Sequence, residues 1–473
     1  MQNNKIKKLV INLVITNLFP ILFSLLFLCL LLPFLNVIPH RDGNVELSQT
    51  IDYMKGGFQM YFNDWAVHPP FKIITASILI KLIPLFPFSY NILGIILGII
   101  GIFGIYSFSL NAFTKKGAII TSSLLAVSPL FMANAIFGLR DYILTVFIII
   151  SLLSYVKRRY IIYAFFASLC VLTKETGLVL IFTVLFVEAI LGAKQIFNRN
   201  YKSLINVTYC LIPFIPWSLW VLFLNANHKG VWDDYVFSNV KGGPFSVVLH
   251  NLLSLNIFTQ YTQEHWKQLF ILNFNWLLWL FIIFSVLLYL RKVFLAKNLL
   301  NEIKRDKIKI RALITIITFF FFYLFTVLTF PTYTIPRYAL PLIPLFIVFI
   351  SLSITSIKNN YIQAFILFSV YSIFLISFFF SIDPISASIW KIKQVGNQNL
   401  YSLDQTIAGN DGITYNYQYL LLVKERTALI RGIEDNKVSL NKKDCGFIFP
   451  DPNNDLKTFK MLKIDLNKFS ICL

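Results

Sequence analysis

Long apolar segments recur along most of this 473-residue chain and restrict the folds that it can adopt. Runs of about 20 apolar residues are long enough to cross the ~30 Å hydrocarbon core of a bilayer as helices. The chain is 57% hydrophobic and contains 48 Phe, far more than a soluble globular domain usually holds. Because backbone groups in lipid must pair within their own segment, the sequence predicts an all-α polytopic membrane protein.

The basic residues indicate how the chain crosses the membrane. The formal net charge of +20 comes from short Lys and Arg clusters between apolar runs, which is the pattern of cytoplasmic loops and not of a nucleic-acid surface. The apolar helix expected at 71–84 is short for a span. Leaving it out of the count places every basic cluster in the cytoplasm. We therefore expect about eleven spans, with eleven to thirteen compatible with the pattern: 9–35, 90–113, 118–137, 142–156, 160–173, 177–191, 204–224, 269–290, 312–330, 338–357 and 361–380.

A polar stretch from Pro39 to Pro70 lies directly after the first apolar run and ends in a His-Pro-Pro triplet. Ionisable groups are costly inside a bilayer, so a membrane protein that acts on a polar substrate needs them at the water boundary. This stretch therefore favours a site, although an ordinary solvated loop remains the alternative. Its carboxylates are Asp42, Glu46, Asp52 and Asp64.

The expected topology gathers further polar residues on the outer side of the membrane. None of them was needed to place the cytoplasmic clusters, so their convergence is an independent argument for a site there. Several begin or interrupt apolar segments, where an unpaired charge is costly. The outer set is Asp42, Glu46, Asp64, His68, Arg140, Asp141, Lys174, Glu175, Tyr333, Arg337 and Tyr338.

The order of these motifs resembles that of the GT-C glycosyltransferases that use polyprenyl-phosphate sugars. The resemblance is carried by the acidic first loop, the His-Pro-Pro triplet, the Arg-Asp pair in SPLFMANAIFGLRDYIL, the Lys in FFASLCVLTKETGLVL, and PRYALPLIPLF. It covers about residues 35 to 190 and 330 to 350 and is closest to the protein mannosyltransferase and lipid A aminoarabinose transferase group.

This resemblance implies a GT-C-like fold and an inverting glycosyltransferase. The enzyme would move a hexosyl or pentosyl group from an undecaprenyl- or dolichyl-phosphate donor to a glycan, lipid or protein acceptor. Transfer would take place outside the cytoplasm, in glycosylation of the cell envelope. The expected location is the cell membrane, with the active site on the extracytoplasmic side.

The resemblance also assigns roles to particular residues. The family's first-loop carboxylate falls on Asp42, and its second carboxylate, at the start of a span, falls on Asp141. The family pattern has an acid directly after the first carboxylate, but here Gly43 follows and Glu46 is the next acid. The candidate catalytic residues are therefore Asp42, Asp141 and Glu46, while Lys174 and Arg337 match cations of the family.

Sugar transfer from a lipid phosphate passes through an oxocarbenium-like transition state. It needs a base for the attacking hydroxyl, cations for the departing phosphate and an apolar groove for the polyprenyl chain. Asp42 is the candidate base, with a helix cap as its alternative role. Asp141 either orients the acceptor or pairs with a nearby cation.

The candidate cations also have alternative roles. Lys174 suits a lipid phosphate but also suits an ion pair with Glu175 or a nearby Asp. Arg337 offers a planar fork that fits phosphate, with interfacial snorkelling as the alternative. His68 either contacts the phosphate or caps the short helix, and Tyr338 fits the aromatic belt of a membrane interface. The candidate substrate-binding residues are His68, Arg140, Lys174, Glu175, Arg337 and Tyr338.

Metal and cysteine chemistry are weakly indicated. The five His are dispersed and show no metal-ligand spacing, so no cofactor is expected with certainty. Asp42 and Asp141 could share a divalent cation, although nothing in the sequence requires one. Cys445 and Cys472 could form a disulfide if the C-terminal region lies outside the cytoplasm, but spacing alone does not decide this.

The sequence suggests two domains. Residues 1–380 form the membrane-embedded catalytic domain, with outer loops at 36–70 and 225–268. Residues 381–473 are enough for a small extracytoplasmic α/β domain, with short alternating segments at 446–449 and 461–466. This domain either helps to choose the acceptor or caps the membrane part.

Two other functions are compatible with such a chain. A transporter or flippase of lipid-linked glycans would need polar groups along a path through the bilayer and often has internal repeats. Here the polar groups cluster at one face, and no repeat is visible. A polymerase of lipid-linked glycans would share the outer-face site.

Overall fold

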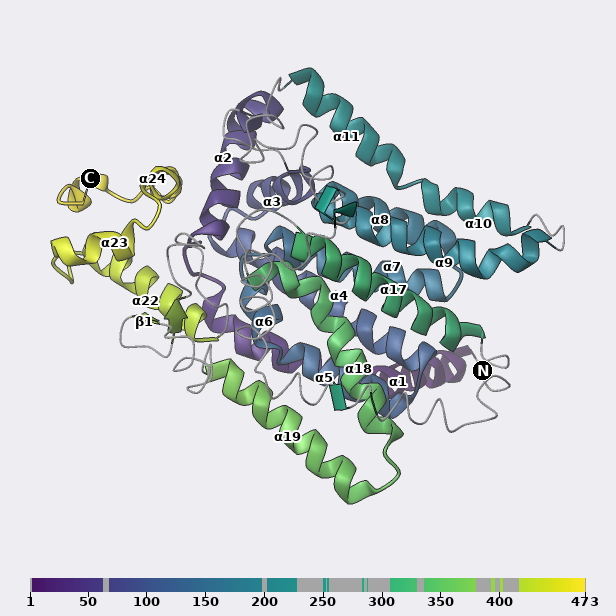
Figure 1. Ribbon diagram of the computed structural model, residues 1–473. Helices are drawn as coiled ribbons and strands as arrows, with labels where there is room; N and C mark the ends of the chain where they lie inside the picture. The colour runs from purple at the N-terminus through teal and green to yellow at the C-terminus, as the bar shows by residue number, and fades with distance from the viewer. Residues whose placement is uncertain are drawn as a thin grey trace.

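The computed structural model shows a helical bundle with a group of shorter helices on one side (Figure 1). This architecture agrees with an all-α polytopic membrane protein. The residues that the structure describes are 2–62, 68–197, 202–227, 307–329, 336–379, 393–395, 400–402 and 417–472, with short pieces between 250 and 287.

Most of the bundle consists of helices joined by short turns. The apolar composition of these segments favours helices because each one satisfies its own backbone hydrogen bonds. Their bounds are α1 Gln2–Leu31, α2 Asp42–Tyr61, α3 Phe71–Leu82, α4 Phe88–Ala112, α5 Lys115–Ala126, α6 Pro129–Ala135, α7 Arg140–Val156, α8 Tyr160–Thr173, α9 Leu178–Phe197, α10 Lys202–Leu211, α11 Phe214–Asn227, α17 Lys307–Thr329, α18 Ile343–Ser356 and α19 Asn360–Phe379.

Six helical segments in the described part of the chain are long and apolar enough to cross a membrane, or seven if the bent pair α5–α6 is one span. The eleven expected spans are therefore not confirmed. α7 and α8 have 17 and 14 residues, and the expected span at 269–290 lies almost entirely outside the described residues. The six segments are Asn17–Phe34, Phe88–Ala112, Ile205–Asn227, Ile308–Thr329, Arg337–Ser356 and Asn360–Ser377.

One expected span, 118–137, is broken. α5 and α6 meet at an angle of 56°, and Pro129 is the first residue of α6. Proline lacks the N–H that would continue the helix and clashes with the preceding turn. The break brings the segment after α6 close to the start of α2, where Phe137 packs against Gly43.

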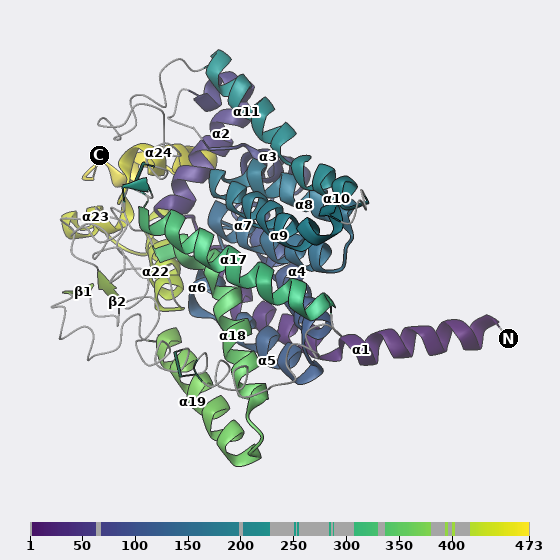
Figure 2. The ribbon, with the colours of Figure 1, turned by 45° about the vertical axis from the view of Figure 1, so that its right-hand side comes forward.

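The core of the bundle is built on close contact between α4 and its neighbours. α4 carries glycines at intervals of three or four residues along its apolar sequence. A methyl group at Gly94 would lie 1.7 Å from the carbonyl oxygen of Ala135, and one at Gly98 would lie 2.3 Å from the hydroxyl of Tyr142. Small residues allow this backbone approach inside membranes. Around this centre, α17 packs against α9 and α18 packs against α5 (Figure 2).

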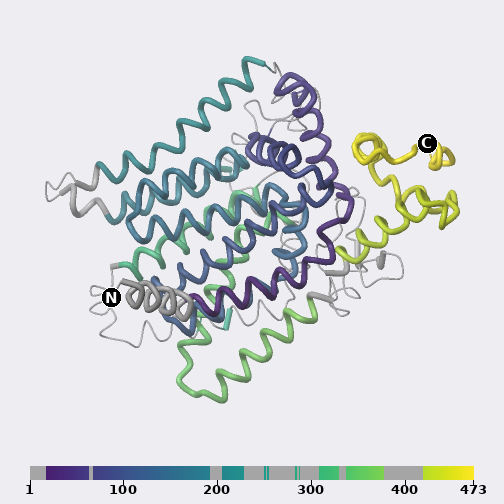
Figure 3. The backbone as a smooth tube through the Cα atoms, turned by 180° about the vertical axis from the view of Figure 1, so that it is seen from behind, coloured from purple at the N-terminus to yellow at the C-terminus, as the bar shows by residue number. Residues whose placement is uncertain are grey.

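The C-terminal helices form a group that we call the tail, residues 417–472. It contains α22 (Tyr417–Glu434), α23 (Cys445–Ile448), α24 (Pro452–Met461) and the 3-10 helix η8 (Leu466–Phe469). In Figure 3 the tail lies beside α2, and α24 contacts α2. Its own core includes Phe449, Phe459 and Phe469, and a disulfide joins Cys445 to Cys472.

The tail does not show the strands that the sequence suggested at 446–449 and 461–466. The first segment lies mainly in the short helix α23, and the second runs from the last residue of α24 through a turn to the first residue of η8. Most of their apolar residues belong to one small core instead of alternating across a sheet, and Pro452 begins α24, a position that proline favours. The described strands are β1 (Lys393–Val395) and β2 (Leu400–Ser402), an antiparallel pair outside the tail.

Candidate functional site

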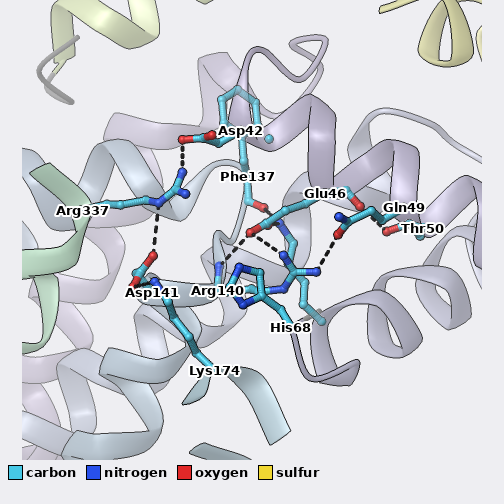
Figure 4. A network of polar contacts seen from close by, with 12 residues as sticks. Asp42, Glu46, Gln49, Thr50, His68, Phe137, Arg140, Asp141, Lys174 and Arg337 are labelled. Atoms are coloured by element: carbon cyan, nitrogen blue, oxygen red, sulfur yellow. Dashed lines mark hydrogen bonds and ion pairs between the residues drawn. The ribbon is translucent and has the colours of Figure 1, made fainter. Parts of the chain in front are cut away.

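The candidate site begins where α2 begins. Asp42 is the first residue of α2, directly after a turn in which Arg41 has φ 46° and ψ −120°. Glu46 and Gln49 follow at helical spacings of four and three residues, so the three side chains share one side of α2. In Figure 4 this side of α2 faces Arg337, Asp141 and Arg140.

A chain of alternating charges runs from Asp42 to Lys174, and we call it the Asp42 chain (Figure 4). Arg337 forms ion pairs with both Asp42 and Asp141, and its Nε lies 3.2 Å from Asp141 Oδ2. Lys174 Nζ donates to Asp141 Oδ1 at 2.6 Å. The ammonium of Lys174 also lies 4.1 Å from the ring centre of Tyr338.

Each member of the Asp42 chain sits at or next to the end of a helix. Asp141 lies in the first turn of α7, where the helix dipole favours a negative charge. Lys174 follows the last residue of α8. Arg337 lies in the 3-10 helix η5 (Pro336–Leu342), which packs against α7 and leads into α18. Asp141 and Lys174 are buried, whereas Asp42 and Arg337 are only partly buried, with side-chain exposures of 15% and 13%.

A second group of charges lies deeper, and we call it the Glu46 cluster. Glu46 forms ion pairs with Lys72 and with Arg140, whose Nη1 lies 3.6 Å from Glu46 Oε1. Lys72 also donates to the carbonyl of Phe137 at 2.8 Å. Arg140 Nη2 donates to Gln49 Oε1 at 2.7 Å. All four charged or amide side chains in this cluster are buried.

Burial and pairing act in opposite directions on the pKa values of the Glu46 cluster. Burial alone would raise the pKa of Glu46, but Lys72 and Arg140 hold it below its ordinary value. Burial lowers the pKa of Lys72 to about 8, with Glu46 opposing the shift. A buried charge is tolerated when it is paired and hydrogen-bonded, so Glu46 serves here as the counter-ion of two cations.

His68 and Glu175 form a third, more open group. Nδ1 of His68 lies 3.0 Å and 3.1 Å from the two carboxylate oxygens of Glu175. The hydroxyl of Tyr61 donates to the carbonyl of His68 at 2.7 Å. Because Glu175 follows Lys174 in the chain, this pair adjoins the end of the Asp42 chain. The side chain of His68 is 35% exposed.

The structure thus places all nine residues chosen from the sequence in these three groups. Asp64 and Tyr333, which the sequence also placed on the outer side, lie outside the described residues, as does most of the loop 225–268. Lys72 and Gln49 were missed. The signal for Lys72 was present, because a Lys on a short apolar helix needs a partner.

A shared divalent ion was one expectation for Asp42 and Asp141. In the structure these two carboxylates share a cation of the protein itself, the guanidinium of Arg337. Within the described ranges, no group of three or more His, Cys, Asp or Glu side chains could hold a metal ion.

The fold and this arrangement define the protein as a membrane-embedded, multi-pass protein of the GT-C fold. The sequence profile of a family described as dolichyl-phosphate-mannose-protein mannosyltransferase matches residues 67–220. That segment runs from just before His68, through Asp141 and Lys174, into α11. No curated protein matches this sequence.

Among solved structures, the chain is similar to ArnT from Cupriavidus metallidurans bound to undecaprenyl phosphate. The TM-score is 0.50 at 15% sequence identity, with 96% of this chain and 76% of that chain covered. The oligosaccharyltransferase of Archaeoglobus fulgidus also matches, with a TM-score of 0.44 at 16% identity, covering 75% of this chain and 51% of that chain. At such identities, similarity to ArnT supports the fold.

Proposed function

We propose that this protein is an inverting glycosyltransferase that takes a sugar from a polyprenyl-phosphate donor and passes it to an acceptor hydroxyl. The observation that carries the proposal is the Asp42 chain, in which partly buried Asp42 lies beside cations that begin or end apolar helices. A carboxylate next to fixed cations at the end of a helical bundle suits a substrate that joins an apolar chain, a phosphate and a sugar.

In this reaction the acceptor oxygen attacks the anomeric carbon while the bond from that carbon to the phosphate oxygen breaks. Asp42 takes the proton of the acceptor hydroxyl, and the lipid phosphate leaves with the bonding electron pair. The attack on the face opposite the phosphate inverts the anomeric configuration. A positioned general base of this kind contributes about 10²–10⁴-fold to the rate.

Arg337 links donor binding to the availability of the base. It pairs with Asp42 and Asp141 in the structure, and a guanidinium binds phosphate through the same fork that binds a carboxylate. A lipid phosphate that binds Nη1 of Arg337 in place of Asp42 makes the Asp42 carboxylate available to the acceptor. Asp141 still holds Arg337 and Lys174 in place during this exchange, so its proposed role is to position the two cations.

The remaining candidates take supporting roles. His68, partly exposed and paired with Glu175, lies where it can donate to a phosphate oxygen. Glu46 is proposed to compensate the charges of Lys72 and Arg140 and not to act on the substrate, because both of its oxygens are already engaged. Tyr338 supports Lys174 through its ring face.

We also propose that the site lies on the extracytoplasmic side, with the membrane domain ending near residue 380 and the tail outside. α7 and α8 support this orientation. α7 starts at Arg140–Asp141 and ends just before Lys157, and α8 starts just after Arg159 and ends just before Lys174. The basic cluster 157–159 therefore lies at the opposite ends of both helices from the site, as expected for a cytoplasmic turn.

Replacement of Asp42 by Asn tests the proposal. Asp42→Asn keeps the shape of the side chain and removes the base, so transfer of labelled sugar in reconstituted membranes should fall by about 10²–10⁴-fold. Donor binding should persist, because the change removes a negative charge next to the phosphate site. The measurement pairs single-turnover transfer with binding of a polyprenyl-phosphate sugar.

Two further variants complete this test. Arg337→Ala should weaken donor binding as well as transfer, since it removes a phosphate ligand. Asp435→Asn breaks an exposed ion pair in the tail with Lys437 and should leave both quantities unchanged. Near-normal transfer by Asp42→Asn would refute the assignment of the base and make Asp141 the next candidate.

A further inference from the structure

The tail holds residues 38–40, on the N-terminal side of Asp42, through three contacts. The N–H of Ile38 donates to Thr427 Oγ1 at 3.0 Å. Nη1 of Arg426 donates to the carbonyl of Pro39 at 3.1 Å. Nδ1 of His40 lies 3.2 Å from the hydroxyl of Tyr419. All three tail residues belong to α22.

The tail also holds the chain on the C-terminal side of Asp42. Nδ2 of Asn44 donates to Asp455 Oδ1 at 2.8 Å, and Thr458 Oγ1 donates to Asn44 Oδ1. Two turns further along α2, Lys457 Nζ lies 2.8 Å from Asp52 Oδ2. These three tail residues belong to α24.

One buried ion pair connects the two sides. Arg426 Nη2 donates to Asp455 Oδ1 at 2.6 Å, and both side chains are fully buried. Arg426 thus bonds Pro39, three residues before Asp42, while its partner Asp455 bonds Asn44, two residues after it. Fully satisfied buried networks of this type fix a single local arrangement.

The turn enclosed by these contacts has an unfavourable backbone. Arg41 has φ 46° and ψ −120°, a conformation that a residue with a side chain rarely adopts. Such a conformation is energetically costly and persists only when its surroundings determine it. Here the surroundings are the contacts of the tail with residues 38–40 and 44.

We propose that the tail is a clamp that positions Asp42, with Arg426, Thr427 and Asp455 as positioning residues that never touch the substrate. The inference rests on the proposed function, because it is the base that the clamp would hold. The distance between the carboxylate and the acceptor then depends on contacts between residues that are 379 to 414 positions apart in the sequence. An error of about 1 Å in such a distance can reduce a rate by about 10²-fold.

Thr427 offers the mildest test. Thr427→Val keeps the shape of the side chain and leaves the N–H of Ile38 without its acceptor, whereas Thr427→Ser keeps the hydroxyl. We expect Thr427→Val to lower kcat by about 10-fold and to leave the KM for the donor unchanged. This loss is smaller than the full cost of displacing a reacting group. Thr427→Ser should have the kcat of the wild type. Asn44→Ala should likewise lower kcat and leave the KM for the donor unchanged. Asp435→Asn in the same tail should behave as the wild type.

Hydrogen exchange tests the clamp independently of the proposed function. In the full-length protein, Thr427→Val and Asn44→Ala should speed exchange of the amides at 38–46 and leave those of α4 and α7 unchanged, because local opening depends on local contacts. Unchanged exchange at 38–46 would refute the clamp. Faster exchange with unaltered kcat would refute its positioning role. A wild-type protein without transfer activity would refute the proposed function alone, and the exchange result would still decide whether the clamp exists.

Discussion

Single residues of the site show how much this protein relies on buried charge pairs. Lys72 is almost fully buried and meets Glu46, the carbonyl of Phe137 and the ring of Tyr90. Breaking a buried ion pair typically costs about 3–5 kcal/mol, and without Lys72 the carboxylate of Glu46 would keep only Arg140, at 3.6 Å, as its cation. Lys72→Met should therefore lower the thermal stability of the detergent-solubilised protein strongly, as measured by the loss of folded monomer on heating.

The partner residue supplies the control for this prediction. The double variant Lys72→Met/Glu46→Gln also removes the carboxylate that pairs with buried Arg140, so it should be less stable than Lys72→Met. A double variant as stable as Lys72→Met would show that the loss comes from packing and not from charge.

The sequence predicted those candidate site residues whose energetic cost of burial can be recognised from their neighbours in the sequence. Asp42, Asp141, Lys174 and Arg337 each interrupt or border an apolar segment, so a charge there required an explanation. Asn44 and Asp455 could not be predicted in this way, because each looks like an ordinary polar residue in its own segment. Their pairing depends on the fold that brings α24 to α2.

At the scale of elements, the glycines of α4 set the distance to its neighbours. Gly94→Ala would place a methyl group 1.7 Å from the backbone oxygen of Ala135, which cannot move like a side chain. Overpacking of this kind typically costs about 1–3 kcal/mol, so we expect lower thermal stability for this variant.

A matched glycine in the tail controls for the substitution itself. Gly446 lies in α23 with no atom within 4 Å of an added methyl group, so Gly446→Ala should be neutral or slightly stabilising. Equal stability of the two variants would contradict the close approach of α4 to the end of α6.

Hydropathy and length predicted many of the helices but not their breaks. The expected spans at 90–113, 160–173 and 361–380 agree with α4, α8 and α19 within a few residues. The expected span at 118–137 is bent by 56° between α5 and α6, and its apolar composition gave no sign of this effect of Pro129 on the helix. The expectation of strands at 446–449 and 461–466 in the tail was wrong, because short apolar runs do not distinguish strands from short helices.

At the scale of the whole molecule, the positions of the basic clusters predict the orientation of the chain. Single cysteines introduced at Lys157 and His68, in a background without Cys29, Cys170 and Cys210, should react differently with an impermeant thiol reagent added from outside. Position 68 should be labelled and position 157 protected. The reverse pattern would place the candidate site in the cytoplasm and contradict the proposed function.

The clamp also has a consequence for biosynthesis. Translation makes residues 38–44 early and residues 419–458 only after the membrane helices, so the segment that carries Asp42 meets its partners last. On this proposal, a nascent chain that already has its bundle still lacks the contacts that position Asp42. A chain that stops before the tail would then carry the proposed base without the clamp, so a positioned carboxylate would require complete synthesis.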